Sequence, residues 1–487
     1  MVKNLTHGSP LKCILGFAAP MFLGMLFQQV YNMVDTMIVG RFLGLEPLAG
    51  VGSTGSLYFL VIGSCTGICS GFAIPVAQSF GAQDDSSVRR FVTNSVWLSA
   101  ALSVVLTTLT VCLCRNMLTL MNTPEEAFEY AYMYIVIIFA GIPTTFLYNV
   151  SSAIIRALGD SRTPLIFLII SSLLNIALDL VFILVCNMNV AGAALATVIS
   201  QLVAGAGCTI YMMRKFDILK MQPGDWKVRG REVKGLCMIG LPMGLQYSIT
   251  AIGSVSVQSA VNSFGSIAVA GVTAANKIYS IISCPQEALG ATMATYAGQN
   301  IGAGKIERVN KGLIQACLVG IGVSILTFIA VLLLNQQMLT LLLDAGETEA
   351  LAYARRFMIV TTAGFPLLTL VCAVRFTIQG MGYSTFAMIA GVLEMIARCF
   401  VAFGLSIWFG FPGVCFSNIC AWIAADSFLV PAFIHCRKVV VRSPLYGGPR
   451  KWSENDGESA AAQSIGCTNK YKARVSESPG TRACVFV

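Results

Sequence analysis

The first long apolar stretch of the chain carries a carboxylic acid near its far end. Asp35 follows Gln28, Tyr31 and Asn32 at spacings that place all four side chains on one face of a helix. The other faces carry Met, Leu, Phe, Val and Ile. An acid at the water boundary would only cap the helix, whereas an acid inside a membrane span indicates a functional site. We favour the functional interpretation because a second acid recurs at a matching depth.

A second polar face lies on a later apolar stretch. Ser172, Asn175 and Asp179 are spaced for one helix face, and Thr197 lies in the stretch that follows. Counted from the expected helix ends at about 1.5 Å per residue, Asp35, Asp179 and Thr197 lie at one level, roughly 8–10 Å below the outer surface. We therefore expect a shared cation site. The alternative is that Asn175 and Thr197 only form hydrogen bonds between neighbouring helices.

Two kinds of chemistry are open to such a site. Burial and a neighbouring carboxylate both favour the protonated form of a carboxyl group, so the pair could hold a proton and release it when water enters. Alternatively, the oxygens of Asp35, Asn175, Asp179 and Thr197 could replace the water around Na⁺, a hard cation that needs oxygen ligands. We expect no cofactor besides H⁺ or Na⁺.

The composition is that of a polytopic membrane protein. Of 487 residues, 56% are hydrophobic and 11% are charged, and the mean hydropathy is +0.75, whereas soluble domains carry about 25% charged residues. The net charge of +9 reflects Lys and Arg in the loops and does not indicate nucleic-acid binding. The 17 Cys follow no metal or disulfide spacing. No expected span has a His in its interior, so an intramembrane metalloenzyme is not expected.

Twelve stretches are long enough to cross a bilayer as helices, because a span needs about 20 apolar residues. The expected fold is therefore all-α. The expected spans are residues 11–40, 47–80, 92–114, 128–155, 163–186, 190–213, 236–261, 267–299, 312–335, 350–376, 383–409 and 412–436. Lys and Arg concentrate in alternate loops, which places both termini in the cytoplasm.

The two halves of the chain repeat. Residues 48–51 (LAGV) match residues 269–272 (VAGV) at an offset of 269 − 48 = 221, and the same offset relates Gln78 to Gln299. Since each half has an even number of spans, we expect two six-helix bundles related by a pseudo-two-fold axis along the membrane normal. The expected organisation is a first bundle (1–213), a cytoplasmic linker (214–235), a second bundle (236–440) and a disordered cytoplasmic tail (441–487).

With these features, residues 10–436 resemble the MATE (multidrug and toxic compound extrusion) family. The motifs that carry the resemblance are residues 32–40 (NMVDTMIVG), the Gly81-Ala82 and Gly302-Ala303 pairs, and residues 156–164 (RALGDSRTP). The polar residues of the first half are similar to those of the DinF-like branch. That resemblance implies a coupling-ion site at Asp35, Asn175, Asp179, Thr197 and Asn149. It also implies a drug pocket at Gln28 and Tyr31, to which we add Asn32, Ser172 and Glu287 as lining of the substrate cleft.

The second half departs from the NorM-like branch, which carries acids in spans seven and ten. Spans 236–261 and 350–376 have no Asp or Glu, so a second-half ion site of that kind is not expected. Glu287 and Glu394 are taken as the remaining intramembrane acids. Glu287 follows Pro285, where a kink could expose it to a cationic substrate. Glu394 could be neutralised by Arg398, four residues further along the same helix.

The resemblance implies a monomeric antiporter in a bacterial plasma membrane, in contact with lipid. It would export amphipathic, often cationic, organic compounds by alternating access, driven by inward H⁺ or Na⁺. The nearest alternative is a lipid-linked oligosaccharide flippase of related fold. That class often needs basic residues in a central cavity, and here only Lys277, Arg375 and Arg398 could serve.

Overall fold

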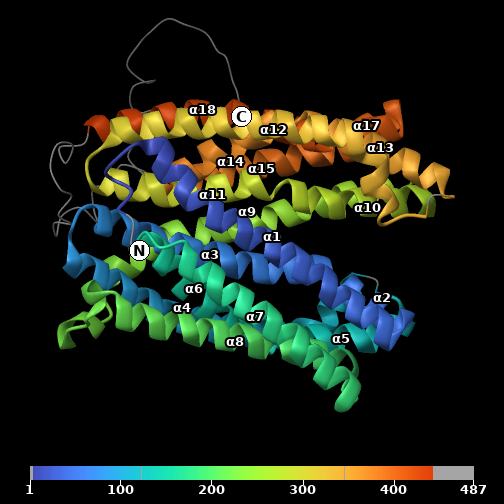
Figure 1. Ribbon diagram of the computed structural model, residues 1–487, viewed down its shortest axis with the longest axis horizontal. Coiled ribbons are helices and arrows are strands. Elements are labelled where there is room, and N and C mark those ends of the chain that lie inside the picture. The colour runs from blue at the N-terminus through green and yellow to red at the C-terminus, as the bar shows by residue number, and fades with distance from the viewer. Residues whose placement is uncertain (1–3, 122, 345, 443–487) are drawn as a thin grey trace, which may run out of the picture. The chain divides into compact units, whose positions relative to one another are not determined.

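The computed structural model describes residues 4–121, 123–344 and 346–442. Within them, nine single helices are long and apolar enough to span a membrane, and three bent helix pairs bring the number of spans to twelve. The first half of the chain forms α1 to α8 and the second half forms α9 to α18, seen as two neighbouring bundles in Figure 1.

The first half begins with one long helix and ends at the linker. Its elements are α1 (Pro10–Leu43), α2 (Leu45–Ser53), α3 (Gly55–Gly81), α4 (Asp85–Leu120), α5 (Glu125–Ala140), α6 (Ile142–Ala157), α7 (Arg162–Leu180), the π-helical segment η1 (Val181–Val185) and α8 (Asn189–Lys215). Two short 3₁₀ turns, η2 (Asp217–Leu219) and η3 (Pro223–Trp226), lie in the linker.

The second half follows the same plan. Its elements are α9 (Gly230–Asn262), α10 (Ser266–Ile282), α11 (Cys284–Gly302), α12 (Ile306–Thr340), α13 (Thr348–Ala363), α14 (Phe365–Gly380), α15 (Ser384–Phe400), the π-helical segment η4 (Val401–Leu405), α16 (Ser406–Phe409), α17 (Phe411–Cys415) and α18 (Ser417–Arg442).

Bends recur where Gly and Pro interrupt the helical pattern. The α5–α6 pair bends by 49° at Gly141, and the α13–α14 pair bends by 50° at Gly364. Pro143 and Pro366 follow two residues later, inside the first turn of the next helix. Proline fits this first turn because its missing N–H has no partner there in any case.

The linker is shorter than the predicted 214–235, because α9 begins at Gly230. It packs on α4 of the first half. The Asp225 carboxylate accepts a hydrogen bond from Arg89 at 2.8 Å, and its main-chain carbonyl accepts one from Thr93 at 2.7 Å. We call the end of the helices that carries this segment the linker end. Of the predicted tail 441–487, residues 443–487 lie outside the described residues.

Helices α3 and α9 join the two halves through glycines. A Cβ atom at Gly71 would lie 2.5 Å from the Cα of Gly240, and one at Gly67 would lie 2.7 Å from the main-chain oxygen of Met243. These helices approach closely only because side chains are missing at the contact, as is common for packed membrane helices. This contact lies between the linker end and the middle of both helices.

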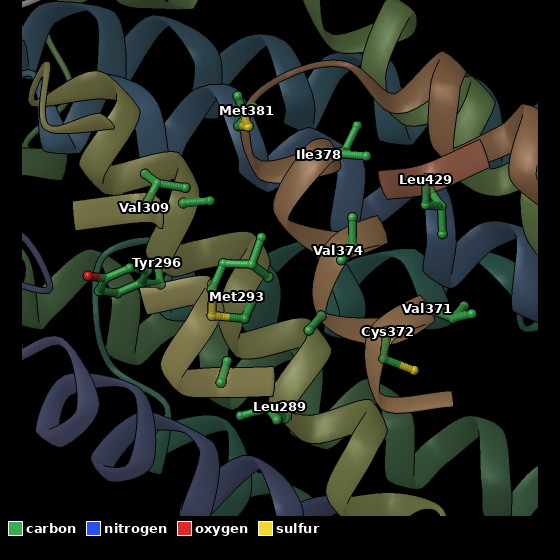
Figure 2. Packing of buried hydrophobic residues seen from close by; sticks show 14 of the residues in the cluster. Leu289, Met293, Tyr296, Val309, Val371, Cys372, Val374, Ile378, Met381 and Leu429 are labelled. Atoms are coloured by element: carbon green, nitrogen blue, oxygen red, sulfur yellow. The ribbon is translucent and has the colours of Figure 1, made fainter. Parts of the chain in front are cut away.

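The largest apolar cluster of the second half is built by α11, α12, α14 and α18 (Figure 2). Ile14 and Phe17 of α1 belong to the same cluster and are almost fully buried. Further along α1, Gly24 instead faces Leu165 and Leu168 of α7 in the first half. Helix α1 therefore contacts the second half near the linker end and the first half beyond Gly24.

Candidate functional site

The two acids predicted in the first half lie together. Asp35 of α1 and Asp179 of α7 have carboxyl groups within hydrogen-bonding reach of each other. Helix α1 packs on α7 along this stretch, so the polar face of each helix is turned toward the other. Two carboxyl groups within hydrogen-bonding reach do not both stay ionised unless a cation lies between them; otherwise one of them holds a proton.

The surroundings of the pair supply few hydrogen-bond donors. Asp179 is fully buried, and neither of its carboxyl oxygens has a donor apart from what Asp35 can offer. The side-chain oxygen of Asn175, one turn before Asp179, is also buried and without a donor. Buried oxygens without donors are costly. The cost would be relieved by a proton or a small cation bound among them.

Thr197 lies beside this group, and Asn149 does not join it by any hydrogen bond of the described residues. The Asn175 amide donates to the Thr197 hydroxyl at 3.4 Å, and that hydroxyl donates to the Ala193 carbonyl at 3.1 Å. The Asn149 amide instead donates to the Thr145 carbonyl on its own helix at 2.8 Å. The geometry therefore brings together Asp35, Asn175, Asp179 and Thr197, but gives no contact that would make Asn149 a ligand.

The residues predicted to line a substrate cleft differ in their exposure. Gln28 and Asn32 are exposed and Tyr31 is half-buried, so the polar face of α1 is partly open. Tyr31 lies within electrostatic range of both acids. Ser172 is buried and its hydroxyl donates to the Leu168 carbonyl of its own helix.

Glu287 of the second half is exposed although it lies in the middle of the eighth span. It follows the 44° bend between α10 and α11, and Pro285 lies in the first turn of α11. Tyr247 of α9 and Tyr279 of α10 lie within electrostatic range of its carboxylate. An exposed acid with two tyrosines within electrostatic range is a suitable contact for an organic cation.

The family model described as MatE matches the chain twice, over residues 20–181 and 242–404. The chain belongs to the MATE family.

Similar proteins and solved structures support this assignment. The probable multidrug resistance protein YoeA of Bacillus subtilis is 29% identical over 423 residues, which cover 81% of this chain and 89% of that protein. The probable multidrug resistance protein YpnP of the same organism is 32% identical over 310 residues, covering 63% and 68%. The solved outward-facing conformation of a multidrug resistance MATE family transporter matches with a TM-score of 0.82 and 22% identity, covering 90% of this chain and 97% of that one.

These comparisons confirm the predicted family and the twelve-span, all-α fold. As a member of the MATE family, the protein is a multi-pass transporter and not an enzyme. The assignment to the DinF-like branch stays a prediction.

The predicted partner of Glu394 in this MATE protein is wrong. Glu394 forms its ion pair with Arg375 of α14, not with Arg398 on its own helix. Arg398 lies one turn further along, and its buried Nη1 has no acceptor. The pairing across helices prevails because α14 and α15 pack together and turn the Arg375 and Glu394 side chains into one buried space.

One intramembrane acid was missed. Asp426 lies ten residues into α18, inside the span predicted at 412–436, so Glu287 and Glu394 are not the only remaining acids. Its signal was visible in the sequence as a single charge within an apolar run. Asp426 is 9% exposed, and neither carboxyl oxygen has a hydrogen-bond partner.

The two MatE repeats share one further irregularity. The π-helical segment η1 begins two residues after Asp179, and the π-helical segment η4 begins three residues after Arg398. The segments start at Val181 and Val401, an offset of 401 − 181 = 220. Because π-helical segments are frequent at functional sites, their equivalent positions draw attention to the charged residues just before each of them.

Proposed function

We propose that this protein exports amphipathic, often cationic, organic compounds by alternating access, driven by inward movement of a small cation. The observation that carries the proposal is the contact between the Asp35 and Asp179 carboxyl groups, with no other donor for the Asp179 oxygens. A proton fits between two such oxygens, and Na⁺ bound by Asp35, Asn175, Asp179 and Thr197 is the alternative. We expect the protein to act as a monomer with its linker end in the cytoplasm.

The position of α1 suggests how ion binding could be coupled to a change in conformation. Asp35 of α1 contacts Asp179 of α7, in the first half. Ile14 and Phe17 of α1 pack instead in the core of the second half. An ion that neutralises Asp35 and Asp179 removes the repulsion between α1 and α7. It shifts the balance of conformations only by the difference in its affinity for the two states.

The substrate is proposed to bind between the halves, in contact with Gln28, Tyr31 and Asn32 on one side and Glu287 on the other. The two groups lie on α1 and α11, which pack against each other nearer the linker end. Neutralising the first-half acids would weaken the attraction for a cationic substrate and favour its release. The multidrug names of the relatives YoeA and YpnP agree with a substrate class of this breadth.

The experiment is efflux of ethidium from proteoliposomes under a pH gradient or a Na⁺ gradient, imposed separately. We expect one gradient to drive efflux by the wild type and Asp179→Asn to abolish that dependence. Asp217→Asn is the matched control, because Asp217 lies in the linker and forms an exposed ion pair with Lys220. It should behave as the wild type.

Three outcomes decide the proposal. Efflux driven by one gradient and lost in Asp179→Asn supports it and names the ion. Efflux that stays coupled in Asp179→Asn contradicts the assignment of the ion site. If neither gradient moves the dye, export of organic cations is contradicted, and flipping of a lipid-linked oligosaccharide becomes the function to test.

A further inference from the structure

A second buried acid site lies in the second half, remote from the Asp35–Asp179 pair. Arg375 of α14 forms an ion pair with Glu394 of α15, and both are at least nine-tenths buried. Asp426 of α18 is within electrostatic range of both residues but forms no ion pair or hydrogen bond with either. One guanidinium group therefore lies near two carboxyl groups and is paired with only one of them.

The charges around Asp426 do not balance. Arg375 contributes one positive charge, while Glu394 and Asp426 contribute two negative charges, and all three side chains are buried. Glu394 does not satisfy every donor of Arg375, because the buried Nε–H of Arg375 has no acceptor. An ionised carboxylate without a donor is very costly in such an interior. A single proton on Asp426 removes both the excess charge and most of this cost.

Among the described residues, Arg375 is the one cation within electrostatic range of Asp426. Helix α12 offers Cys317 and α14 offers Cys372, both within electrostatic range of Asp426. The η4 segment and α17, which also contact α18, carry no charged residue. Arg398 of α15 is within electrostatic range of Tyr279, as Glu394 is, but it is not among the charges that act on Asp426. The nearby guanidinium of Arg375 disfavours a metal cation, which leaves a proton as the ligand.

Cys372 of α14 lies within electrostatic range both of Asp426 and of the exposed Glu287. Arg375 and Glu394 are also within electrostatic range of Cys372. Cys372 and Leu429, the residue one turn after Asp426, belong to the same apolar cluster (Figure 2). Glu287 is exposed, so one member of this group of ionisable side chains reaches water.

We propose that Asp426 is a second proton-binding site, which is loaded and emptied as Arg375 changes partner between Glu394 and Asp426. In the described arrangement, Arg375 binds Glu394 and the Asp426 carboxylate takes a proton from water. When α14 shifts relative to α15, Arg375 binds Asp426 instead, and the proton returns to water while Glu394 is left to accept one. The proposal extends the antiport proposed above, but its main test does not depend on transport.

The test is infrared difference spectroscopy of protein in which only the aspartates carry ¹³C, so that glutamates do not contribute to the shifted carboxyl band. The starting variant is Asp35→Asn/Asp179→Asn, which removes the first-half pair. At about pH 6, roughly two units above the ordinary pKa of aspartate, we expect one protonated aspartate band to remain. Adding Asp426→Asn should remove it. Absence of the band from the folded starting variant overturns the proposal, even if the triple variant does not fold.

Exchange of Arg375 between the acids is tested by Glu394→Gln in the same background. With its first partner neutral, Arg375 becomes available to Asp426, and the protonated band should disappear at pH 6. A band that persists unchanged contradicts the exchange. In transport, Asp426→Asn should lower the number of protons moved per ethidium, while Asp426→Glu should restore it. An unchanged proton count in Asp426→Asn, measured where the wild type does export the dye, would show that Asp426 is only structural.

Discussion

Gln78 and Gln299 cross the boundary between the two halves in opposite directions. The Gln78 amide donates to the main-chain carbonyl of Gly380 at 3.0 Å, and the Gln299 amide donates to that of Ala157 at 2.8 Å. The glutamines are related by the repeat offset of 221, and all four residues are fully or almost fully buried. These two hydrogen bonds join the halves at the linker end, and we expect both to break when that end opens. The amide of Leu5 adds a third bond to the Gln299 side chain at 2.9 Å.

Removing one of these hydrogen bonds should favour opening of the linker end. We expect Gln78→Ala to raise hydrogen–deuterium exchange at the linker-end turns of α3 and α11. A hydrogen bond of about 1 kcal/mol corresponds to a roughly fivefold shift in the open population. Gln337→Ala, at an exposed position near the opposite end of α12, should leave exchange at both helices unchanged. Equal exchange in wild type and Gln78→Ala would show that the bond does not hold the closed state.

The close approach of α3 and α11 at the linker end should not tolerate a side chain. A Cβ atom at Gly302 would lie 1.8 Å from the Gln78 carbonyl oxygen, and one at Gly81 would lie 1.9 Å from that of Gln299. Both contacts are with main chain that cannot turn aside, so Gly302→Ala should destabilise the closed state by at least about 1–3 kcal/mol. The melting temperature should fall and exchange at the ends of α3 and α11 should rise. Gly322→Ala, whose Cβ would meet nothing within 4 Å, is the control. Because alanine is favoured over glycine in a helix interior, this variant should neither lower the melting temperature nor raise exchange.

The linker should lose its attachment to the first half at acid pH. Burial by itself would raise the pKa of Asp225, but the Gln222 N–H and the Arg89 guanidinium outweigh it and hold the pKa below the ordinary value. A lowered native pKa stabilises the folded form above about pH 4 and loses that contribution as pH falls through the range below. Asp225→Asn should therefore cost about 1–3 kcal/mol at neutral pH, and less at pH 3.

Thermal unfolding of wild type and variant across this pH range checks the prediction. Asp217→Asn is a matched control in the same linker, because the Asp217–Lys220 pair is exposed on both sides and should not affect stability measurably. A difference between wild type and Asp225→Asn that persists undiminished at pH 3 would contradict an ionised, stabilising Asp225.

Local spacing was enough to predict where the first-half acids lie on their helices. Asn175 and Asp179 are four residues apart, so any helix places them on one face. The contact of Asp179 with Asp35 also required α1 to pack on α7, which the matching depths suggested. The family resemblance added Asn149, for which the structure shows only a bond within its own helix. Depth along separate helices does not specify which of them pack together.

The second half shows why local spacing was insufficient there. Arg398 is four residues from Glu394 and was the natural helical partner, but Arg375 on a different helix takes that role. A long arginine side chain can reach across a helix interface, and the packing of α14 on α15 decides which acid it meets. Span counting also treated 412–436 as a plain apolar span. A single acid such as Asp426 hardly changes mean hydropathy, so its burial without a partner becomes visible only in the folded chain.

Glu287 should contribute to affinity for cationic substrates and not for neutral ones. Its carboxylate is exposed and lies within electrostatic range of Tyr247 and Tyr279, so it can attract a cation without being committed to an ion pair. Glu287→Gln keeps the size of the side chain and removes its charge. At an exposed site a charge contact contributes about 1 kcal/mol, so KM for ethidium efflux should rise roughly fivefold, with little change in KM for an uncharged substrate. Glu349→Gln, an exposed acid at the start of α13, should alter neither value. An equal rise in KM for charged and uncharged substrates would mean that Glu287 has a structural role and does not recognise the charge of the substrate.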